Sequence, residues 1–217
     1  MKASLEAVQK FWDERAQSSG SNQHTVDWSQ RTQLMRFLAL AQLIRLEGMS
    51  ILDIGCGTGD FLGFLKHQGI SAEYTGFDIS SVMVKRCQER FPEANFISGD
   101  FLGWTPDRTF DYTIAIGIHN IKAEGARDIL EATLRRQFEL SDKAAHLSIL
   151  STRYEGFDSH IQAWNPMEIL ELAMSITPYV AFRHDYLPHD FSLTLFKAPT
   201  IDCWLGAQAQ VPKGDAS

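Results

Sequence analysis

Three glycines and two acids lie close together in the stretch ILDIGCGTGD, residues 51–60. The glycines are Gly55, Gly57 and Gly59, and they follow a run of apolar residues that favours a buried strand. A glycine-rich turn between a strand and a helix lets a ligand approach the backbone closely. This turn therefore predicts a nucleotide-like ligand.

The charges around the turn argue against a dinucleotide. A dinucleotide loop sets the N-terminus of a helix against a pyrophosphate, but here Asp60 stands where the last glycine of such a loop would be. An anion at the start of a helix repels a pyrophosphate. Asp53 adds a second negative charge before the glycines. Two carboxylates around one turn suit a ligand that carries an ammonium or sulfonium group.

Two further acids follow later strand candidates. Asp78, in YTGFDIS, lies about 20 residues beyond the glycines, where a carboxylate can accept the hydroxyls of an adenosine ribose. Asp100, in ISGDF, is expected to accept from an adenine amino group, with Phe101 beside the ring. The acids together predict an adenosyl ligand with a cationic group.

Candidates for catalysis gather in later loops. A histidine with a pKa near neutrality can act as a general base, and His119 is the first candidate because it directly follows a predicted strand. Tyr154 lies in a later loop, and Tyr186 and His189 lie in the ionisable stretch RHDYLPHDF. We expect these residues at the substrate pocket; the alternative for RHDYLPHDF is a hydrogen-bonded turn that fixes a hairpin.

Alternating strands and helices are expected to position these residues. Predicted strands are residues 50–54, 73–78, 95–98, 110–116, 145–150, 180–184 and 192–197, and predicted helices are residues 5–15, 61–68, 81–91, 123–139 and 166–175. One more helix, capped by Asp27 or Ser29, is predicted from apolar residues at helical spacing: Leu34, Phe37, Leu38, Leu40, Ala41 and Ile44. Such alternation predicts a parallel sheet covered on both faces. The last two strands have a short connection and should be antiparallel. We expect one domain, with N-terminal helices as a lid (residues 1–48), a core (49–198) and a tail (199–217).

Composition narrows the function classes. The 217 residues are 44% hydrophobic and 22% charged, with a formal net charge of −7, as in an ordinary globular protein without a nucleic-acid surface. The three cysteines have no CxxC spacing, and no close histidine pair predicts a metal site. Neither a signal peptide nor a membrane span is recognisable, so a cytoplasmic location is expected. The sequence carries no indication of the oligomeric state.

Four motifs in order resemble the class I S-adenosylmethionine-dependent methyltransferases. They are DIGCGTG (53–59), FDIS (77–80), GDF (99–101) and FDYTIAIGIHN (110–120), and the resemblance covers roughly residues 50–197. It implies a three-layer αβα fold with a seven-stranded, mostly parallel sheet of order 3-2-1-4-5-7-6, an antiparallel last strand and an N-terminal helical lid. It also implies S-adenosylmethionine as cofactor and S-adenosylhomocysteine as product.

The resemblance assigns roles to single residues. The glycines would let the backbone approach the methionine portion and ribose, with Asp53 by the amino group, Asp78 on the ribose and Asp100 by the adenine. Arg15, in an N-terminal FWDERA stretch, would pair with the cofactor carboxylate. The remaining residues of the implied cofactor site are Trp12, Cys56, Ile79, Phe101 and Ile116.

The acceptor is expected to be a small molecule. Subfamilies that methylate bases or amides carry an Asn/Asp-Pro-Pro-Tyr type segment after the fourth strand, whereas this chain has Gly-Ile-His-Asn at 117–120. This difference favours a hydroxyl, carboxylate or amine, and we expect O-methylation of a biosynthetic sugar or natural-product intermediate. Alternatives are N-methylation of a small amine or a protein side chain, a non-catalytic adenosyl-binding protein, and a nicotinamide oxidoreductase, which Asp60 opposes.

Overall fold

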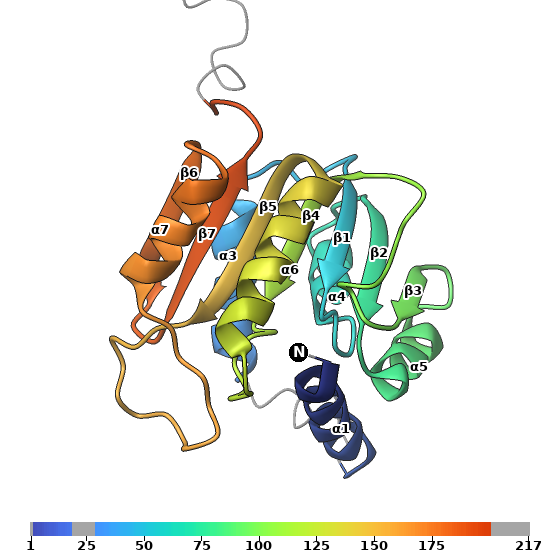
Figure 1. The fold of residues 1–217 in the computed structure, drawn as a ribbon. Helices are drawn as coiled ribbons and strands as arrows, with labels where there is room; N and C mark the ends of the chain where they lie inside the picture. Colours follow the sequence, from blue (N-terminus) through green and yellow to red (C-terminus); the bar gives the residue numbers. More distant parts are fainter. Residues whose placement is uncertain (1, 19–28, 201–217) are drawn as a thin grey trace, which may run out of the picture.

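The protein forms one seven-stranded sheet of order β3-β2-β1-β4-β5-β7-β6 (Figure 1). The computed structural model describes residues 2–18 and 29–200, so most of the expected tail lies outside the described residues. The strands are β1 Ser50–Ile54, β2 Glu73–Asp78, β3 Asn95–Ser98, β4 Phe110–Ile116, β5 Ser141–Leu150, β6 Val180–Leu187 and β7 Asp190–Phe196. The helices are α1 Lys2–Ser18, α3 Gln30–Ala41, α4 Asp60–His67, α5 Ser81–Arg90, α6 Ala126–Leu140 and α7 Pro166–Ile176.

The strand directions confirm the predicted topology. Strands β1 to β5 pair in parallel, and β7 is antiparallel to both β5 and β6. The bounds of strands β5, β6 and β7 differ from the sequence-based expectation. Strand β5 begins at Ser141, and its first residues were missed because they are polar. Strand β6 ends at Leu187, and strand β7 begins at Asp190. Most of RHDYLPHDF is therefore strand, and only Pro188 and His189 form the turn.

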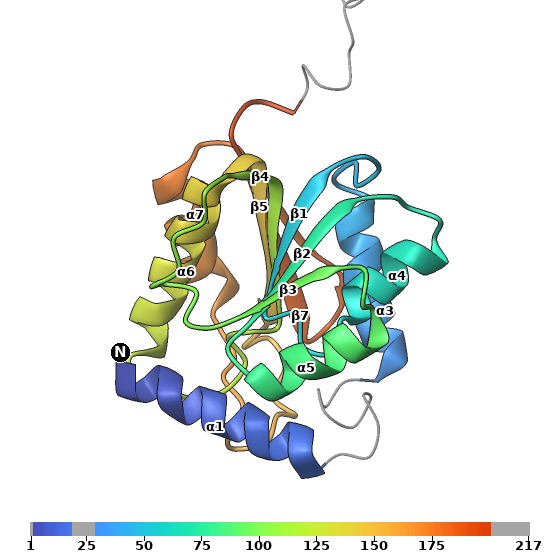
Figure 2. The ribbon, with the colours of Figure 1, turned by 90° about the vertical axis from the view of Figure 1, so that its right-hand side faces the viewer.

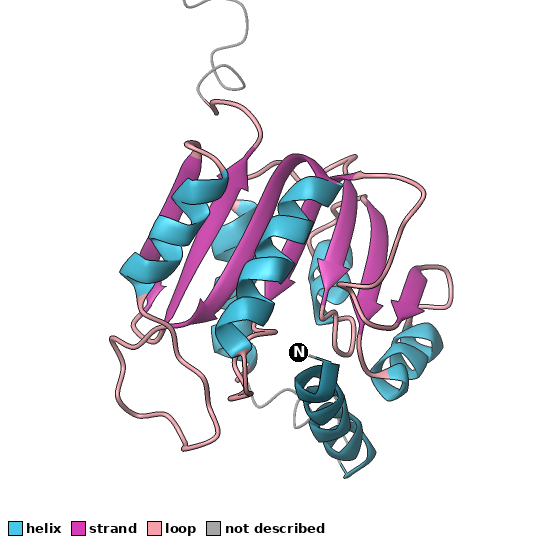
Figure 3. Cartoon of the chain, in the orientation of Figure 1, coloured by secondary structure: helices cyan, strands magenta, loops and turns pink. Residues whose placement is uncertain are grey.

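Helices cover both faces of the sheet in three layers (Figures 2 and 3). Helices α6 and α7 lie on one face, and α3, α4 and α5 lie on the other. Neighbouring residues of β1 face opposite layers, because side chains alternate along a strand. Leu52 packs into the core beneath α6 and α7, and Ile51 packs into the core beneath α3 and α4. The central strands are therefore buried on both sides.

Helix α1 lies across the carboxyl ends of the parallel strands (Figure 2). The Ser80 hydroxyl donates a hydrogen bond to the Asp13 carboxylate, and the Arg86 guanidinium donates to the carbonyl of Ala16. On the other side, the Phe11 ring lies 6.2 Å from the His160 ring, in the long loop between β5 and α7. Helix α1 thus bridges α5 and that loop. Among the described helices, none combines the length and the apolar character needed to cross a lipid bilayer.

Candidate active site

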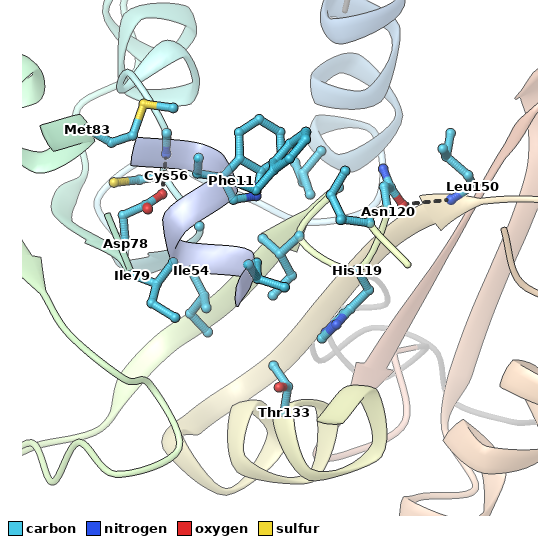
Figure 4. Close-up of a pocket in the computed structure, with 18 of the residues that line it drawn as sticks. Phe11, Ile54, Cys56, Asp78, Ile79, Met83, His119, Asn120, Thr133 and Leu150 are labelled. Atoms are coloured by element: carbon cyan, nitrogen blue, oxygen red, sulfur yellow. Dashed lines mark hydrogen bonds between the residues drawn. The ribbon is translucent and has the colours of Figure 1, made fainter. Parts of the chain in front are cut away.

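A cavity of about 580 Å³ lies at the carboxyl ends of the parallel strands, beneath α1. This volume falls within the ~300–1,000 Å³ typical of small-molecule sites. Its walls come from α1, α3, the glycine turn, the ends of β2, β3 and β4, and the loop after β5. Figure 4 shows how side chains from several of these elements converge on it. The fold therefore gathers distant segments around one site.

The glycine turn closes one end of the cavity. Gly55, Gly57 and Gly59 have φ angles of 73°, 54° and 76°, a left-handed conformation that glycine adopts without steric cost. The backbone N–H of Gly57 donates to Asp78 at 2.9 Å. A Cβ atom added at Gly55 would lie 2.0 Å from the Cγ2 of Ile118, so the turn packs tightly against the loop after β4.

Asp53 and Asp78 are buried acids beside this turn. The Tyr74 hydroxyl donates to Asp53 at 2.6 Å, yet burial raises the pKa of Asp53 to about 7, with a further contribution from the charge of Asp78. Burial also raises the pKa of Asp78 to about 6, although the N–H groups of Gly57 and Ser80 both donate to it. A cation in the cavity would favour the ionised form of both acids. This end of the site therefore fits a positively charged ligand.

Asp60 stands at the start of α4, where a dinucleotide would place its pyrophosphate. Its carboxylate forms an ion pair with Arg90 at 2.5 Å and accepts a hydrogen bond from the Gln33 side chain at 3.2 Å. A carboxylate already occupies this helix start, so the site does not fit a pyrophosphate.

The predicted adenine contacts lie at the ends of β3 and β4. The exposed Asp100 accepts a hydrogen bond from the N–H of Leu102 at 3.0 Å. Phe101 is buried, with its ring 5.9 Å from the Phe77 ring in an edge-on arrangement. The remaining predicted cofactor residues also line the cavity: Trp12, Arg15, Cys56, Ile79 and Ile116.

His119 and Asn120 follow β4 and point in different directions (Figure 4). The His119 ring lies on the side of Thr133 in α6, and the Asn120 carboxamide lies on the side of Leu150, whose N–H donates to its Oδ1 at 3.3 Å. Burial lowers the pKa of His119 to about 4. Within the described part of the chain, the buried atoms His119 Nε2 and Asn120 Nδ2 have no hydrogen-bond partner. Both residues line the cavity.

The other predicted catalytic residues differ in whether they line the cavity. His189 lines the cavity. Tyr154 and Tyr186 are not among the described residues that line it. Tyr154 is 42% exposed, with its ring 5.6 Å from the His189 ring. The Tyr186 hydroxyl donates to Asp190 at 2.5 Å, and burial raises its pKa well above the ordinary value. Catalytic roles for these two tyrosines stay predictions.

Arg36 lines the cavity and was not expected there. It is 2% exposed, and its Nε donates to the carboxylate of Asp190 at 2.8 Å. Sequence reasoning assigned the buried side of this helix to its leucines and phenylalanine, so a buried arginine gave no signal. Asp190 did fall within RHDYLPHDF, but the sequence could not show that its partner lies in α3.

Comparisons with known proteins relate this chain to methyltransferases. The family described as "Methyltransferase domain" matches residues 51–136. A protein of Mycobacterium tuberculosis that carries a methyltransferase name is 29% identical over 167 residues, covering 70% of this chain and 95% of its own. Trans-aconitate 2-methyltransferase of Afipia carboxidovorans is 37% identical over 101 residues, covering 42% of this chain and 39% of its own.

Solved structures show the same fold. Magnesium protoporphyrin IX methyltransferase from Synechocystis, with bound S-adenosylhomocysteine, has a TM-score of 0.64 at 15% identity. The match covers 90% of this chain and all of that one. Residues 51–136 thus match a methyltransferase domain, and the sheet order gives this chain the fold of the class I S-adenosylmethionine-dependent methyltransferases.

Proposed function

We propose that this protein transfers the methyl group of S-adenosylmethionine to an oxygen atom of a small-molecule acceptor, a biosynthetic sugar or natural-product intermediate. One observation carries the proposal. A single cavity runs from the acidic glycine turn past His119 and Asn120 to α3, and it lies beneath α1. Donor and acceptor can thus lie in line within one cavity, as an in-line displacement requires.

The residues at the glycine turn would hold the cofactor, which when bound supplies a methyl carbon on a positively charged sulfur. Asp78 would accept the ribose hydroxyls with the lone pairs that Gly57 and Ser80 leave free, and Asp53 would face the ammonium group. Asp100, Phe101 and Ile116 would surround the adenine, and Arg15 would pair with the carboxylate. Helix α1, acting as a lid with Trp12, would exclude water from the cavity.

His119 is the proposed contact to the acceptor oxygen. With a pKa of about 4, its imidazole is neutral at physiological pH and holds a proton weakly. An efficient general base has a pKa near the working pH. His119 therefore suits an acceptor that loses its proton readily. A His119→Ala enzyme that keeps full turnover at neutral pH would exclude His119 as the base.

A small acceptor fits the cover over the site. Helix α1 and the loop after β5 both line the cavity, and they contact each other through Phe11 and His160. A protein side chain would need an open groove in their place. Relatives named for trans-aconitate and a structural neighbour named for magnesium protoporphyrin IX also support a small acceptor.

Two measurements test the proposal. Calorimetry should detect binding of S-adenosylhomocysteine, and no binding at millimolar ligand would refute the cofactor assignment. Metabolite extracts incubated with methyl-labelled cofactor should yield a labelled small molecule by mass spectrometry. Binding without any labelled product would instead favour a non-catalytic adenosyl-binding protein.

A further inference from the structure

Arg36 and Asn120 both line the cavity, and Asn120 lies away from Asp78 in Figure 4. The N–H of Leu150 donates to Asn120 Oδ1 at 3.3 Å, and Leu150 pairs with Asp190 across strands β5 and β7. Asp190 in turn accepts from Arg36 Nε at 2.8 Å. Arg36, Asn120 and Leu150 all line the cavity. We refer to the surface between Arg36 and Asn120 as the donor corner.

The Asn120 carboxamide offers an unused donor to this corner. Its Oδ1 accepts from Leu150, which fixes the orientation of the amide group. The side chain is 4% exposed, and its Nδ2 has no partner among the described residues. A buried N–H group without an acceptor costs free energy. An oxygen atom of a ligand would accept the missing hydrogen bond from Asn120 Nδ2.

The electrostatics of the corner favour an anion. Asp190 is fully buried behind Arg36, so the pair presents its positive end to the cavity. The N-terminus of α3 also faces the cavity through its cap, Ser29, and a helix N-terminus carries partial positive charge. Asp158 of the loop after β5 lines the cavity too, but its side chain is exposed, where solvent screens its charge.

We infer that the acceptor carries a carboxylate group, which the donor corner of Arg36 and Asn120 holds and which receives the methyl group. This inference rests on the proposed function and names its substrate class. A planar guanidinium and an amide N–H suit the two oxygens of a carboxylate. The acidic turn would then hold the cationic ligand and the donor corner the anionic one, at opposite ends of one cavity.

The reaction balances without a base. One carboxylate oxygen forms a bond to the methyl carbon while the carbon–sulfur bond breaks, and the electron pair of that bond remains on sulfur. The products are a methyl ester and S-adenosylhomocysteine, and no proton is transferred. This matches the weak basicity of the buried His119.

Nuclear magnetic resonance on the ¹⁵N-labelled protein with bound S-adenosylhomocysteine tests the donor corner directly. The side-chain amide signals of Asn120 are identified by their loss in Asn120→Asp. Acetate should shift these signals and acetamide should not, because the corner selects the negative charge. Equal shifts with both probes, or no shift with acetate up to its solubility limit, would overturn the inference.

Asn120→Asp should also weaken acetate binding by about 10- to 100-fold, because it replaces a donor to a charged group with a like charge. Asn165→Asp is the matched control, since Asn165 caps α7 outside the cavity and aspartate caps a helix equally well. The control should bind acetate as the unaltered protein does. Equal affinity in both variants would remove Asn120 from the site.

The chemistry of the labelled product gives a second test. A methyl ester releases its labelled methyl group as methanol in alkali, whereas methyl ethers and methylamines are stable. An alkali-stable product with normal S-adenosylhomocysteine binding would overturn the carboxylate inference and leave the methyltransferase function intact. Failure to bind S-adenosylhomocysteine would instead refute the proposed function itself.

Discussion

Arg36 and Asp190 form a buried ion pair across 154 residues of sequence, with 2.8 Å between Nε and Oδ2. The hydroxyls of Ser148 and Tyr186 donate to the other carboxylate oxygen at 2.7 and 2.5 Å. The pair joins α3, which lines the cavity, to the start of β7. It therefore fixes a wall of the site from outside the cofactor motifs.

Replacement of Asp190 by Asn should lower the free energy of unfolding by about 3–5 kcal/mol, because it removes a buried carboxylate that pairs with the Arg36 charge. Urea denaturation measures the change. Arg135→Gln is the control: it breaks the exposed Arg135–Glu131 pair and should cost no more than about 1 kcal/mol. Similar losses in the two variants would show that the buried pair contributes no more than a surface one.

Gly55→Ala should destabilise the protein far more than Gly48→Ala. Both glycines have φ near 72°, at 73° and 72°, so each alanine carries a similar backbone strain. A Cβ at Gly55 would meet Ile118 at 2.0 Å, whereas a Cβ at Gly48 meets nothing within 4 Å. The difference in unfolding free energy between the two variants measures the cost of the clash with Ile118. Adding Ile118→Ala to the Gly55→Ala variant should restore part of the lost stability. Equal destabilisation at both glycines would contradict this packing.

Asp78→Asn should weaken the binding of S-adenosylhomocysteine by about 1–3 kcal/mol, because it removes a charged acceptor for the ribose hydroxyls. Calorimetry measures the affinity. Asp107→Asn makes the same change in an exposed loop outside the cavity and should leave binding unaltered. An affinity that Asp78→Asn does not change would remove Asp78 from its proposed role.

The Asp53 carboxyl should contribute a loss of stability in the ligand-free protein as the pH rises from about 4 to about 7. The pKa of Asp53 is about 7 in the folded protein against an ordinary 3.8, so in this range the folded state binds a proton that the unfolded state has lost. The contribution of Asp53 to the unfolding free energy therefore falls with rising pH, and Asp78, with its pKa raised to about 6, acts in the same direction. The buried His119 and His146, with pKa values lowered to about 4 and about 3, act in the opposite direction.

Asp53→Asn should remove the Asp53 contribution, since an amide does not titrate, so the variant should gain stability relative to the unaltered protein as the pH rises. Urea denaturation at a series of pH values compares the variant with the unaltered protein, and parallel curves would refute the role of Asp53. In the unaltered protein, S-adenosylhomocysteine should bind more tightly as the pH rises through 7, because its ammonium group favours the ionised Asp53.

Much of the fold could be predicted because its signals are local. The predicted bounds of β1 to β4 coincide with the structure, since apolar runs and turn residues mark both of their ends. The start of β5 was missed because Ser141, Asp142 and Lys143 are polar. The ionisable residues in RHDYLPHDF resembled a loop, yet Asp190 lies buried in a strand because a distant arginine compensates its charge.

In the candidate site, too, the residues set by local sequence could be predicted, and those set by tertiary contacts could not. The glycine turn and Asp78 could be located from sequence, because their geometry depends on residues close to them in the chain. Arg36 could not, because its burial depends on an ion pair with the distant Asp190 of β7. His119 was found by its position after β4, but the burial that lowers its pKa is a tertiary effect.

The opposite charges at the two ends of the cavity bear on turnover as well as on binding. The acidic turn attracts a sulfonium ion more strongly than the neutral thioether that remains after transfer. With a carboxylate acceptor, the donor corner likewise loses its anion when the ester forms. The same electric field that draws both substrates in would therefore release both products, so the enzyme should show little inhibition by its ester.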